Sequence, residues 1–395
     1  MTNLSRLFLN AGADRRLRHG HPWAYSNEIR MDAAAKALPA GSLARLCRVD
    51  GKPLGVGTFN PHVLIAFRML SENADAAIDE GFLAGRLRRA LALRERLYDE
   101  PFYRLVHAES DGLPGLIVDR FGDVAVLQVN TAGMEALSPS LLAAVDAVLK
   151  PRAVVLRNDT PARQAEGLEA YVKVAKGDVA GPVELRENGL VFFADPVAGQ
   201  KTGWFFDQRD NRAFVAPLAK GRRMLDVYSY GGGFGIAAAA AGATEAVIVD
   251  SSEGALDLVR RAAQANGVAG RCKPVRGDAY RELERLAAAG ERFGVVACDP
   301  PAFVKSRKDL KAGLKGYRKL AGLAAPLIEP GGFLFLASCS HNVAPAELLD
   351  EAAAGIGRAG RSGRLIRQAG AAPDHPVHPH LPETAYLKAL VFQLD

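Results

Sequence analysis

The stretch Gly221–Asp250, GRRMLDVYSYGGGFGIAAAAAGATEAVIVD, joins an apolar run, a glycine cluster, an alanine-rich segment and a second apolar run that ends in an acid. Met224–Tyr228 predicts a buried parallel strand, and the glycines predict a strand-to-helix turn that leaves backbone amides open to a ligand. Asp250 follows Gly232 by 18 residues (232 to 250), about the spacing at which a carboxylate reaches the ribose of a nucleotide-like cofactor. The stretch predicts a Rossmann-like unit with a bound cofactor, and a tight turn without a ligand is the alternative.

Strands and helices alternate along the rest of the chain from Met224 onward, which predicts a parallel, doubly wound sheet. Ligands bind such sheets at the carboxyl ends of the strands. Five chemically capable positions fall at or just beyond those ends, and they predict a functional edge: Asp226, Asp250, Asp278, Asp299 and Cys339. The predicted strands are Met224–Tyr228, Ala246–Asp250, Lys273–Arg276, Val295–Asp299 and Phe333–Ser338.

The composition indicates a soluble globular protein with room for two or three domains, because 49% of the 395 residues are hydrophobic and 24% are charged. A net charge of +6 favours a polyanionic partner only slightly. The four cysteines show no C-x-x-C spacing, and His375, His378 and His380 predict a proline-stiffened loop, so we expect neither disulfides nor a metal. No apolar run reaches about 18 residues and no signal-peptide core is present, so we expect a cytoplasmic protein without a membrane partner.

The glycine spacing Gly231-x-Gly233-x-Gly235, with Asp226 before it, differs from the G-x-G-x-x-G of dinucleotide sites. It resembles motif I of the class I S-adenosylmethionine-dependent methyltransferases. Arg276-Gly277-Asp278-Ala279 resembles the family's adenine-contacting segment, and Asp299-Pro300-Pro301-Ala302-Phe303 resembles motif IV, the substrate-facing loop. The resemblance implies S-adenosylmethionine as the cofactor and an α/β, Rossmann-like methyltransferase sheet, with Tyr386–Gln393 as the hairpin partner typical of these enzymes.

The same resemblance implies the cofactor contacts. The acid of motif I, here Asp226, helps orient the methionine amine in the family. KTGWFFDQRDNR (Lys201–Arg212) is close to the segment that lines the family's cofactor pocket, which would place Gln208 and Arg209 near the methionine carboxylate; the residues alone favour a capped helix start equally. The predicted cofactor-binding residues are Gln208, Arg209, Asp226, Tyr228, Ser229, Gly231, Gly233, Phe234, Asp250, Ser251, Asp278 and Ala279.

The first third of the chain predicts a β-barrel of about 70 residues, because short strands alternate with turn signals, including a hairpin around Asp50-Gly51. GHPWAYSNEI (Gly20–Ile29) and GVGTFN (Gly55–Asn60) resemble the PUA domain at the N-terminus of a family of ribosomal RNA methyltransferases. PUA domains bind structured RNA. The resemblance therefore favours phosphate contacts by Arg15, Arg16 and Arg18, in what we expect to be a basic loop.

The middle of the chain predicts an amphipathic helix over Asp75–Asp99 with its arginines on the solvent side, followed by strands and a helix at Gly133–Leu149. ESDGLPGLIVDRFGD (Glu109–Asp123) resembles the central domain of the same family, to which we assign no chemistry beyond a wall of the substrate cleft. The predicted domains are a PUA-like domain at 1–72, a central α+β domain at 73–182 and a methyltransferase domain at 183–395.

Cys339 stands in Ser338-Cys339-Ser340, which resembles motif VI of the RNA cytosine-C5 methyltransferases, whose cysteine is the nucleophile. Carbon five of cytosine is a poor nucleophile, and a thiolate that adds to carbon six activates it. The resemblance implies Cys339 and Asp299 as catalytic residues, although a lone strand-end cysteine is more often structural. Cys298 should face a helix layer, because it points away from Asp299 along the strand.

The segment Val304–Lys319 is rich in lysine and arginine, and it borders the motif IV loop. A solvated helix is the alternative, but we favour phosphate contacts for some of these residues. Phe303 is a candidate to stack on the target base. The predicted substrate-binding residues are Pro300, Pro301, Phe303, Lys305 and Arg307.

The resemblance implies a methyltransferase that forms 5-methylcytosine in large-subunit ribosomal RNA through a covalent cysteine adduct. One alternative methylates an exocyclic amine of an RNA base, which also uses a proline-proline loop and needs no cysteine. The other is a non-catalytic RNA-binding protein of ribosome assembly. The sequence leaves open the target nucleotide, the choice between naked RNA and a subunit particle, the base that removes the carbon-five proton, and whether the protein is a homodimer.

Overall fold

The computed structural model describes residues 4–395, so Met1–Asn3 at the start of the first predicted domain lie outside it. The chain forms two compact units. The first unit runs up to Gly181 and includes Pro196–Gly203 and Asp374–Thr384, two segments from the range predicted for the methyltransferase domain. The second unit contains Pro182–Asp195, Trp204–Pro373 and Ala385–Asp395. The boundaries of the three predicted domains stay a prediction.

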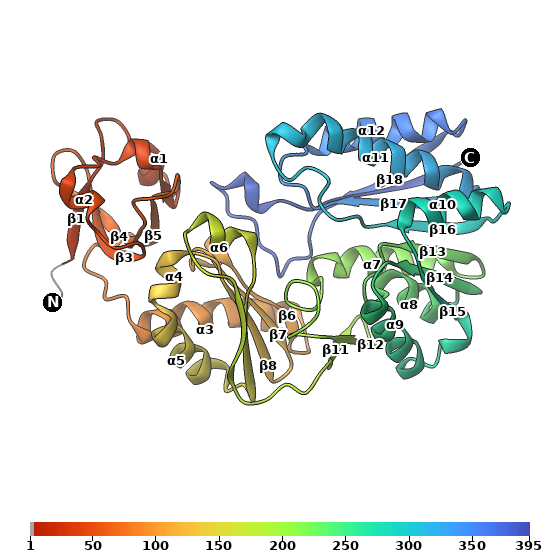
Figure 1. The fold of residues 1–395 in the computed structure, drawn as a ribbon, viewed down its shortest axis with the longest axis horizontal. Helices are drawn as coiled ribbons and strands as arrows, with labels where there is room; N and C mark the ends of the chain where they lie inside the picture. The colour runs from red at the N-terminus through yellow and green to blue at the C-terminus, as the bar shows by residue number, and fades with distance from the viewer. Residues whose placement is uncertain (1–3) are drawn as a thin grey trace. The chain divides into compact units, whose positions relative to one another are not determined.

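The first unit begins with a five-stranded sheet in the order β1-β3-β4-β5-β2 (Figure 1). The predicted hairpin is present, because β3 and β4 pair antiparallel around Asp50-Gly51, with Gly51 at φ 87°. Small helices cover the sheet. The elements of this part are β1 (Ser5–Phe8), α1 (Arg15–Arg18), β2 (Trp23–Ala24), η1 (Ser26–Glu28), α2 (Ala33–Lys36), β3 (Ser42–Cys47), β4 (Pro53–Phe59) and β5 (Phe67–Ser71).

The arginines that follow β1 are tied into this part of the fold. Arg15–Arg18 form the one-turn helix α1, where we expected a loop. Both carboxylate oxygens of Glu28 accept hydrogen bonds from the guanidinium of Arg16 at 2.8 Å. Arg18 forms an ion pair with Asp14 at 3.0 Å. Arg16 is thus paired within this part of the fold, and phosphate contacts by Arg15, Arg16 and Arg18 stay a prediction.

A second five-stranded sheet, in the order β10-β9-β8-β7-β6, carries the predicted α+β unit. The predicted helix Gly133–Leu149 is broken at Leu137, because Pro139 lacks an amide hydrogen and begins a new helix. The elements are α3 (Glu80–Leu97), β6 (Phe102–His107), η2 (Ala108–Asp111), β7 (Leu116–Phe121), β8 (Val124–Val129), α4 (Ala132–Ala136), α5 (Ser138–Leu149), β9 (Ala153–Asn158), α6 (Pro161–Ala165) and β10 (Tyr171–Lys176).

Helix α3 corrects one sequence-based expectation. Its arginines were expected on the solvent side, but the Arg94 side chain is fully buried. Arg94 donates hydrogen bonds to both carboxylate oxygens of Asp111, at 2.6 and 2.8 Å, and to the backbone oxygens of Arg104 and Asp374. A buried charge persists only when it is paired and hydrogen-bonded in this way. Arg94 is therefore a core residue of the first unit.

The second unit contains a sheet with seven strands within residues 4–395, in the order β15-β14-β13-β16-β17-β19-β18 (Figure 1). The five predicted strands are present and parallel, and β19 runs antiparallel between β17 and β18. Strand β18 was not predicted. The strands are β13 (Arg223–Val227), β14 (Glu245–Asp250), β15 (Cys272–Arg276), β16 (Phe293–Cys298), β17 (Ile328–Ser338), β18 (Gly363–Ala369) and β19 (Lys388–Leu394).

Helices cover both faces of this sheet (Figure 1). Alternate residues of β13 point to opposite faces: Leu225 and Val227 pack with α10, α11 and α12, whereas Met224 packs with α7 and α8. The helices are η3 (Phe206–Gln208), α7 (Arg209–Val215), η4 (Ala216–Ala219), α8 (Gly233–Ala240), α9 (Glu253–Ala265), η5 (Ala269–Arg271), α10 (Ala279–Ala288), η6 (Arg307–Asp309), α11 (Leu310–Ala324), η7 (Ala325–Leu327), α12 (Pro345–Arg358) and η8 (Pro382–Thr384), the last of which belongs to the first unit.

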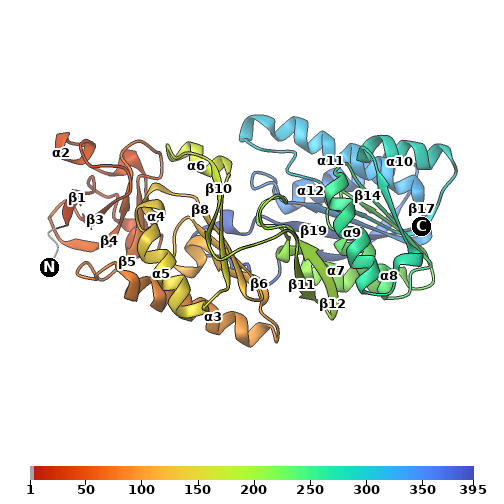
Figure 2. The ribbon, with the colours of Figure 1, turned by 60° about the horizontal axis from the view of Figure 1, so that its bottom comes forward.

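Two local features of the second unit follow from short sequence signals, an Asn-Gly turn and a serine helix cap. The hairpin of β11 (Val183–Glu187) and β12 (Leu190–Ala194) turns at Asn188-Gly189, both at positive φ, and it lies beside α9 (Figure 2). Ser252 caps α9, because its hydroxyl accepts a hydrogen bond from the amide of Ala255 at 3.3 Å. No helix within residues 4–395 is long and apolar enough to cross a membrane.

Replacing Arg94 by methionine should lower the free energy of unfolding of the first unit by about 3–5 kcal/mol, because Asp111 would keep a buried, uncompensated charge. Urea unfolding followed by circular dichroism measures this change. The control is Arg88→Met on the exposed side of α3, which should stay within about 0.5 kcal/mol of the parent protein. Equal stabilities of the two variants would contradict a structural role for the buried pair.

Candidate active site

The carboxyl ends of β13, β14, β15, β16 and β17 share one edge of the sheet, because the five strands are parallel. The register pairs Val227 with Cys298 and Cys298 with Leu336. The strand order reverses between β13 and β16, which is where open α/β sheets bind their ligands. The structure therefore brings all five predicted positions to one edge: Asp226, Asp250, Asp278, Asp299 and Cys339.

The turn between β13 and α8 has a strained backbone. Tyr228 and Tyr230 adopt φ values of 61° and 48°, and Gly232, the N-cap of α8, adopts 76°. Positive φ is uncommon for residues other than glycine, and such strain is concentrated at functional sites. Ser229 lies between the two tyrosines and is buried, and its hydroxyl has no hydrogen-bond partner among residues 4–395. A buried polar atom without a partner is where a ligand would be expected to bind.

Packing also requires glycine in this turn, in addition to the positive φ of Gly232. A Cβ atom on Gly233 would lie 2.3 Å from Nε of Arg212, and one on Gly235 would lie 2.6 Å from the side chain of Ile248. Protein side chains, rather than an approaching ligand, occupy the space next to these two residues. Gly231 is also tight, because its Cβ would lie 3.0 Å from the Trp204 ring.

Asp226 lies beneath the glycine turn and is 1% exposed. Its carboxylate accepts a hydrogen bond from the Gly235 amide at 2.8 Å, which holds the first turn of α8 against the strand. Burial, with a smaller effect of the charges of Asp299 and Asp250, raises the pKa of Asp226 to about 7, although the Gly235 hydrogen bond and the charge of Arg212 lower it. The visible role of Asp226 is to anchor the turn, and its contact with a methionine amine stays a prediction.

Asp250 is the last residue of β14. Its two carboxylate oxygens each accept one hydrogen bond, from the amides of Tyr230 and Ser252, both at 2.9 Å. An ionised carboxylate offers about four acceptor positions, so capacity is left for the hydroxyls of a ribose. Ser251 next to it is exposed.

Asp278 follows β15 and caps α10. Its side chain is exposed and accepts a hydrogen bond from the Arg281 amide at 3.1 Å, and Gly277 donates to the backbone oxygen of Asp250 at 3.0 Å. Ala279 is buried in the core of the second unit. The two strand ends that carry Asp250 and Asp278 are thereby joined.

The segment before α7 is organised by Glu187, which ends β11 and is 3% exposed. The Glu187 carboxylate accepts hydrogen bonds from the Trp204 indole at 3.0 Å and from Arg212 at 2.7 Å, and it lies 3.7 Å from Nε of Arg209. The Arg212 guanidinium lies 4.6 Å from the centre of the Trp204 ring. Gln208 is also buried beside this group. The predicted Gln208 and Arg209 thus begin a helix that is anchored directly under the glycine turn.

The Ser338-Cys339-Ser340 loop is clamped to the motif IV loop. Ser340 accepts a hydrogen bond from the Val304 amide at 3.2 Å, and its hydroxyl lies 2.9 Å from that of Tyr317. Ser338 donates to the same Tyr317 hydroxyl at 2.8 Å. Both serines are fully buried, whereas Cys339 between them is only half-buried. The hydrogen bonds therefore fix the two serines and leave Cys339 partly exposed.

Lys388, the first residue of β19, reinforces this loop. Its buried ammonium group donates hydrogen bonds to the backbone oxygens of Ser340 at 2.6 Å and Tyr386 at 2.8 Å. Burial lowers the pKa of Lys388, and electrostatic attraction to Cys339 and Glu347 opposes that change. The Lys388 ammonium group is therefore near enough to Cys339 for their charges to interact.

The predicted substrate-facing residues follow β16 in a loop that packs on α11. Pro300 is buried and Pro301 is exposed. The Phe303 ring is half-buried, with its centre 4.7 Å from that of Tyr317. One side of Phe303 is thus occupied by protein, and stacking on a base stays a prediction. Lys305 and Arg307 are exposed beyond it.

Cys298 faces the helix layer, as the alternation along β16 predicted. Its side chain is fully buried in the core that contains Leu320 and Leu336. Burial raises the pKa of this thiol, and the charges of Asp226 and Asp299 raise it further. Cys298 is a structural residue.

The histidines near the C-terminus do not gather into a metal site. Among residues 4–395, no group of three or more His, Cys, Asp or Glu side chains is placed to hold a metal ion. His375 is buried 2.8 Å from the carboxylate of Asp374, and the His378 ring accepts a hydrogen bond from the amide of His380. These residues lie in the first unit, in a segment that is anchored by Arg94.

Comparison with known proteins identifies the family. Residues 155–393 match the S-adenosylmethionine-dependent methyltransferases, and residues 7–72 match a PUA-like domain. The chain is an S-adenosylmethionine-dependent methyltransferase. It belongs with "Ribosomal RNA large subunit methyltransferase I" of Pseudoalteromonas atlantica, to which it is 34% identical over 98% of both chains, and with that of Erwinia tasmaniensis, at 36% over 97% of this chain and 98% of the relative.

Two solved structures share the fold of this methyltransferase over its whole length. One is described as an S-adenosylmethionine-dependent methyltransferase from Streptococcus mutans, with 18% identity, a TM-score of 0.81, and coverage of 99% of this chain and 100% of the other. The second is a methyltransferase solved in complex with SAH, with 17% identity, a TM-score of 0.83 and the same coverage. These similarities confirm the predicted fold class, a Rossmann-like methyltransferase sheet preceded by a PUA-like domain.

The family's cofactor fits the observed turn. S-adenosylmethionine presents ribose hydroxyls, an ammonium group and a carboxylate. The turn offers the unpartnered hydroxyl of Ser229 and the remaining acceptor capacity of Asp250, and Arg209 adds a buried cation. The donors and acceptors are therefore of the kinds that this methyltransferase needs.

Sequence reasoning missed three side chains of the site, namely Glu187, Arg212 and Lys388. Alternate residues of a strand point to the same side, and Glu187 is on the side of β11 that carries the buried Val183 and Leu185. This alternation could have identified Glu187 as a buried acid. Nothing in the local sequence distinguishes Arg212 or Lys388 from ordinary solvated cations.

The raised pKa of Asp226 predicts how the stability of the second unit depends on pH. The folded state binds this proton up to about pH 7 and the unfolded state only up to about pH 4, so stability falls as the pH rises between those values, by at most about 4 kcal/mol. Asp226→Asn removes that loss. Calorimetry measures the melting temperatures of the variant and the parent protein at pH 5 and pH 8. The difference, variant minus parent, should be several degrees larger at pH 8 than at pH 5. A difference that does not change with pH would contradict the raised pKa.

Proposed function

We propose that this methyltransferase forms 5-methylcytosine in large-subunit ribosomal RNA through a covalent adduct on Cys339. The observation that carries the proposal is a half-buried thiol at the same sheet edge as the glycine turn, in a loop clamped to the motif IV loop by Ser340. Both relatives described above are named as large-subunit ribosomal RNA methyltransferases. The match of residues 7–72 to a PUA-like domain supports RNA as the substrate.

The chemistry begins at carbon six of cytosine. The Cys339 thiolate adds there, a carbon–sulfur bond forms, and the electron pair of the ring double bond makes carbon five nucleophilic. S-adenosylmethionine, when bound, supplies the methyl group that carbon five accepts. Loss of the carbon-five proton to a base then returns its electron pair to the ring, the double bond re-forms, and the Cys339 sulfur leaves as a thiolate. Asp299 hydrogen-bonds the cytosine edge and stabilises the charge of the adduct.

The other residues of the edge hold the reactants. Asp250 and Ser251 bind the ribose, Asp278 and Ala279 contact the adenine, and Gln208 and Arg209 contact the methionine carboxylate. The turn that carries Ser229 takes the methionine part, with Asp226 beneath it. The remaining residues proposed at the cofactor are Tyr228, Gly231, Gly233 and Phe234, and those proposed at the RNA are Pro300, Pro301, Phe303, Lys305 and Arg307.

Replacing Cys339 by alanine should reduce methyl transfer by more than roughly a thousandfold, because the nucleophile is lost. The assay follows labelled methyl groups from S-adenosylmethionine into in vitro-transcribed large-subunit ribosomal RNA, with the product base identified. Binding of S-adenosylmethionine, measured by calorimetry, should be unchanged. The matched control is Cys272→Ala, a half-buried cysteine on β15 of the same unit.

Transfer that persists without Cys339 would overturn the adduct and favour methylation of an exocyclic amine. Failure of the parent protein to bind S-adenosylmethionine would favour a non-catalytic RNA-binding protein. RNA that contains 5-fluorocytosine offers a direct test, because the fluorine blocks loss of the carbon-five substituent. It should leave a covalent complex that survives denaturation and depends on Cys339.

Lys388 should control the reactivity of Cys339, because its ammonium group favours the thiolate and holds the loop through Ser340. Alkylation by iodoacetamide at pH 7, followed by mass spectrometry of the Cys339 peptide, should slow several-fold in Lys388→Met. Lys388→Arg keeps the charge and should retain most of the rate. The Cys272 peptide is an internal control, because burial raises its pKa to about 11 and Lys388 should not affect it. Unchanged alkylation of Cys339 in Lys388→Met would contradict this role.

A further inference from the structure

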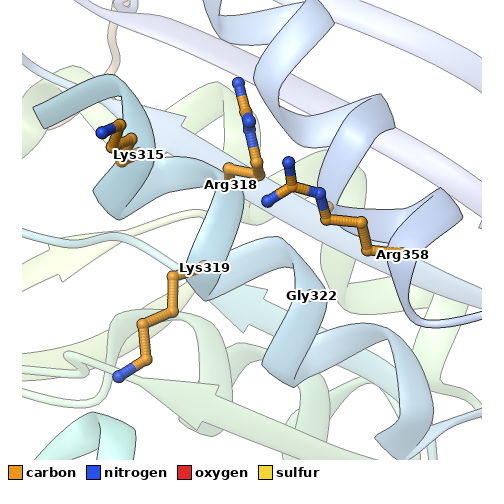
Figure 3. Close-up of a pocket in the computed structure, with 6 residues that line it drawn as sticks. Lys315, Arg318, Lys319, Gly322 and Arg358 are labelled. Carbon is orange, nitrogen blue, oxygen red and sulfur yellow. The ribbon is translucent and has the colours of Figure 1, made fainter. Parts of the chain in front are cut away.

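Helices α11 and α12 lie side by side on one face of the second unit, and a pocket of about 490 Å³ opens between them. Figure 3 shows the basic side chains that line it, which come from both helices. Its lining residues are Lys315, Arg318, Lys319, Gly322, Gly355 and Arg358. None of the residues proposed above for the cofactor or the reaction is among them, so this α11–α12 basic pocket is separate from the carboxyl edge.

The floor of the pocket is backbone. A Cβ atom on Gly355 would lie 2.3 Å from the backbone oxygen of Arg318, and one on Gly322 would lie 3.3 Å from the backbone oxygen of Gly355. The two helices thus approach to backbone contact at these glycines, and the longer side chains around them form the walls. The glycines therefore allow the close approach of the two helices at the base of the pocket.

Positive charge on the walls exceeds the negative charge that could neutralise it. Arg318 is held by Glu351 at 2.5 and 2.7 Å, which fixes its guanidinium. The Lys319 ammonium lies 4.8 Å from the centre of the Tyr280 ring. Its distance to the carboxylate of Glu284 is 4.0 Å, which is long for an ion pair. Lys315 and Arg358 are exposed and have no ion pair among residues 4–395. At least two cations are therefore available to an anionic ligand.

The pocket continues a row of cations that begins at the motif IV loop. Lys308, Lys311, Lys315 and Lys319 recur at intervals of three or four residues, which places them along one side of η6 and α11. The part from Lys311 to Lys319 extends about 12 Å at the rise of an α-helix. All four lysines are exposed. A polyanion bound at the motif IV loop could therefore follow α11 as far as the pocket.

We propose that the α11–α12 basic pocket binds the phosphodiester backbone of the RNA substrate, away from the target base. The lining supplies lysine and arginine donors but no aromatic, amide or carboxylate side chain that could read a base or stack on it. Contacts of this kind position a nucleic acid without selecting its sequence. The proposal rests on the proposed function only in taking RNA as the substrate.

The test compares two double variants of the full-length protein that lose the same charge. Lys315→Ala/Arg358→Ala removes the two available cations of the pocket. Arg261→Ala/Lys273→Ala removes two exposed cations on α9 and β15 of the same unit. Fluorescence anisotropy measures binding of in vitro-transcribed large-subunit ribosomal RNA between 50 and 300 mM KCl, a range of about sixfold.

Loss of two phosphate contacts should weaken RNA binding about 10- to 30-fold near 150 mM salt and reduce the slope of log affinity against log salt by about 1.4–1.8. The control variant should show neither change. Affinity for S-adenosylmethionine and the methylation rate at saturating RNA should stay at the parent values in both variants. A charge-reversed variant, Lys315→Glu/Arg358→Glu, should weaken RNA binding further.

Equal affinity and salt slope for the pocket variant and its control would overturn the proposal. Loss of S-adenosylmethionine binding in the pocket variant would also overturn it, because the residues would then support the fold instead. The proposed function fails separately, when the parent protein binds this RNA but transfers no methyl group to cytosine carbon five. In that case the anisotropy comparison still tests whether the pocket binds RNA.

Discussion

Parallel pairing of β13 with β16, and of β16 with β17, is the constraint on which the site depends. It places the glycine turn, the motif IV loop and the loop of Cys339 at neighbouring strand ends, although they are far apart in the chain. The apolar strands are buried on both faces, so a slip of register would expose core residues and is strongly opposed. Asp226 and Asp299 therefore lie close enough for their charges to interact.

Buried polar groups then fix the loops that this pairing brings together. Glu187 holds the segment before α7 through Trp204 and Arg212, and Tyr317 holds both serines beside Cys339. Such networks rigidify a protein only when their members are satisfied, because an unpaired buried charge is costly. The hydroxyl of Ser229 in the glycine turn has no hydrogen-bond partner among residues 4–395. Hydrogen-bonded side chains thus surround the turn that carries this hydroxyl.

Strands and helices were predictable where a single strong pattern dominated. Strands β13, β14, β16 and β17 of the second unit contain runs of buried apolar residues. The missed strands β10 and β18 are largely exposed, with little alternation to mark them. Arg94 was assigned to the wrong side of α3, because its burial depends on Asp111 and on the backbone of Asp374, which the helix itself does not reveal.

The sequence by itself determined the chemistry available to this protein: the glycine turn, the acids at the strand ends, and the cysteine between two serines. Each lies within a short segment whose local pattern is informative. Only the tertiary structure decided which charges act together. Glu187, Arg94 and Lys388 gain their roles from partners in other segments of the chain. The local sequence does not show these partners, and they determine whether water or protein surrounds a charged side chain.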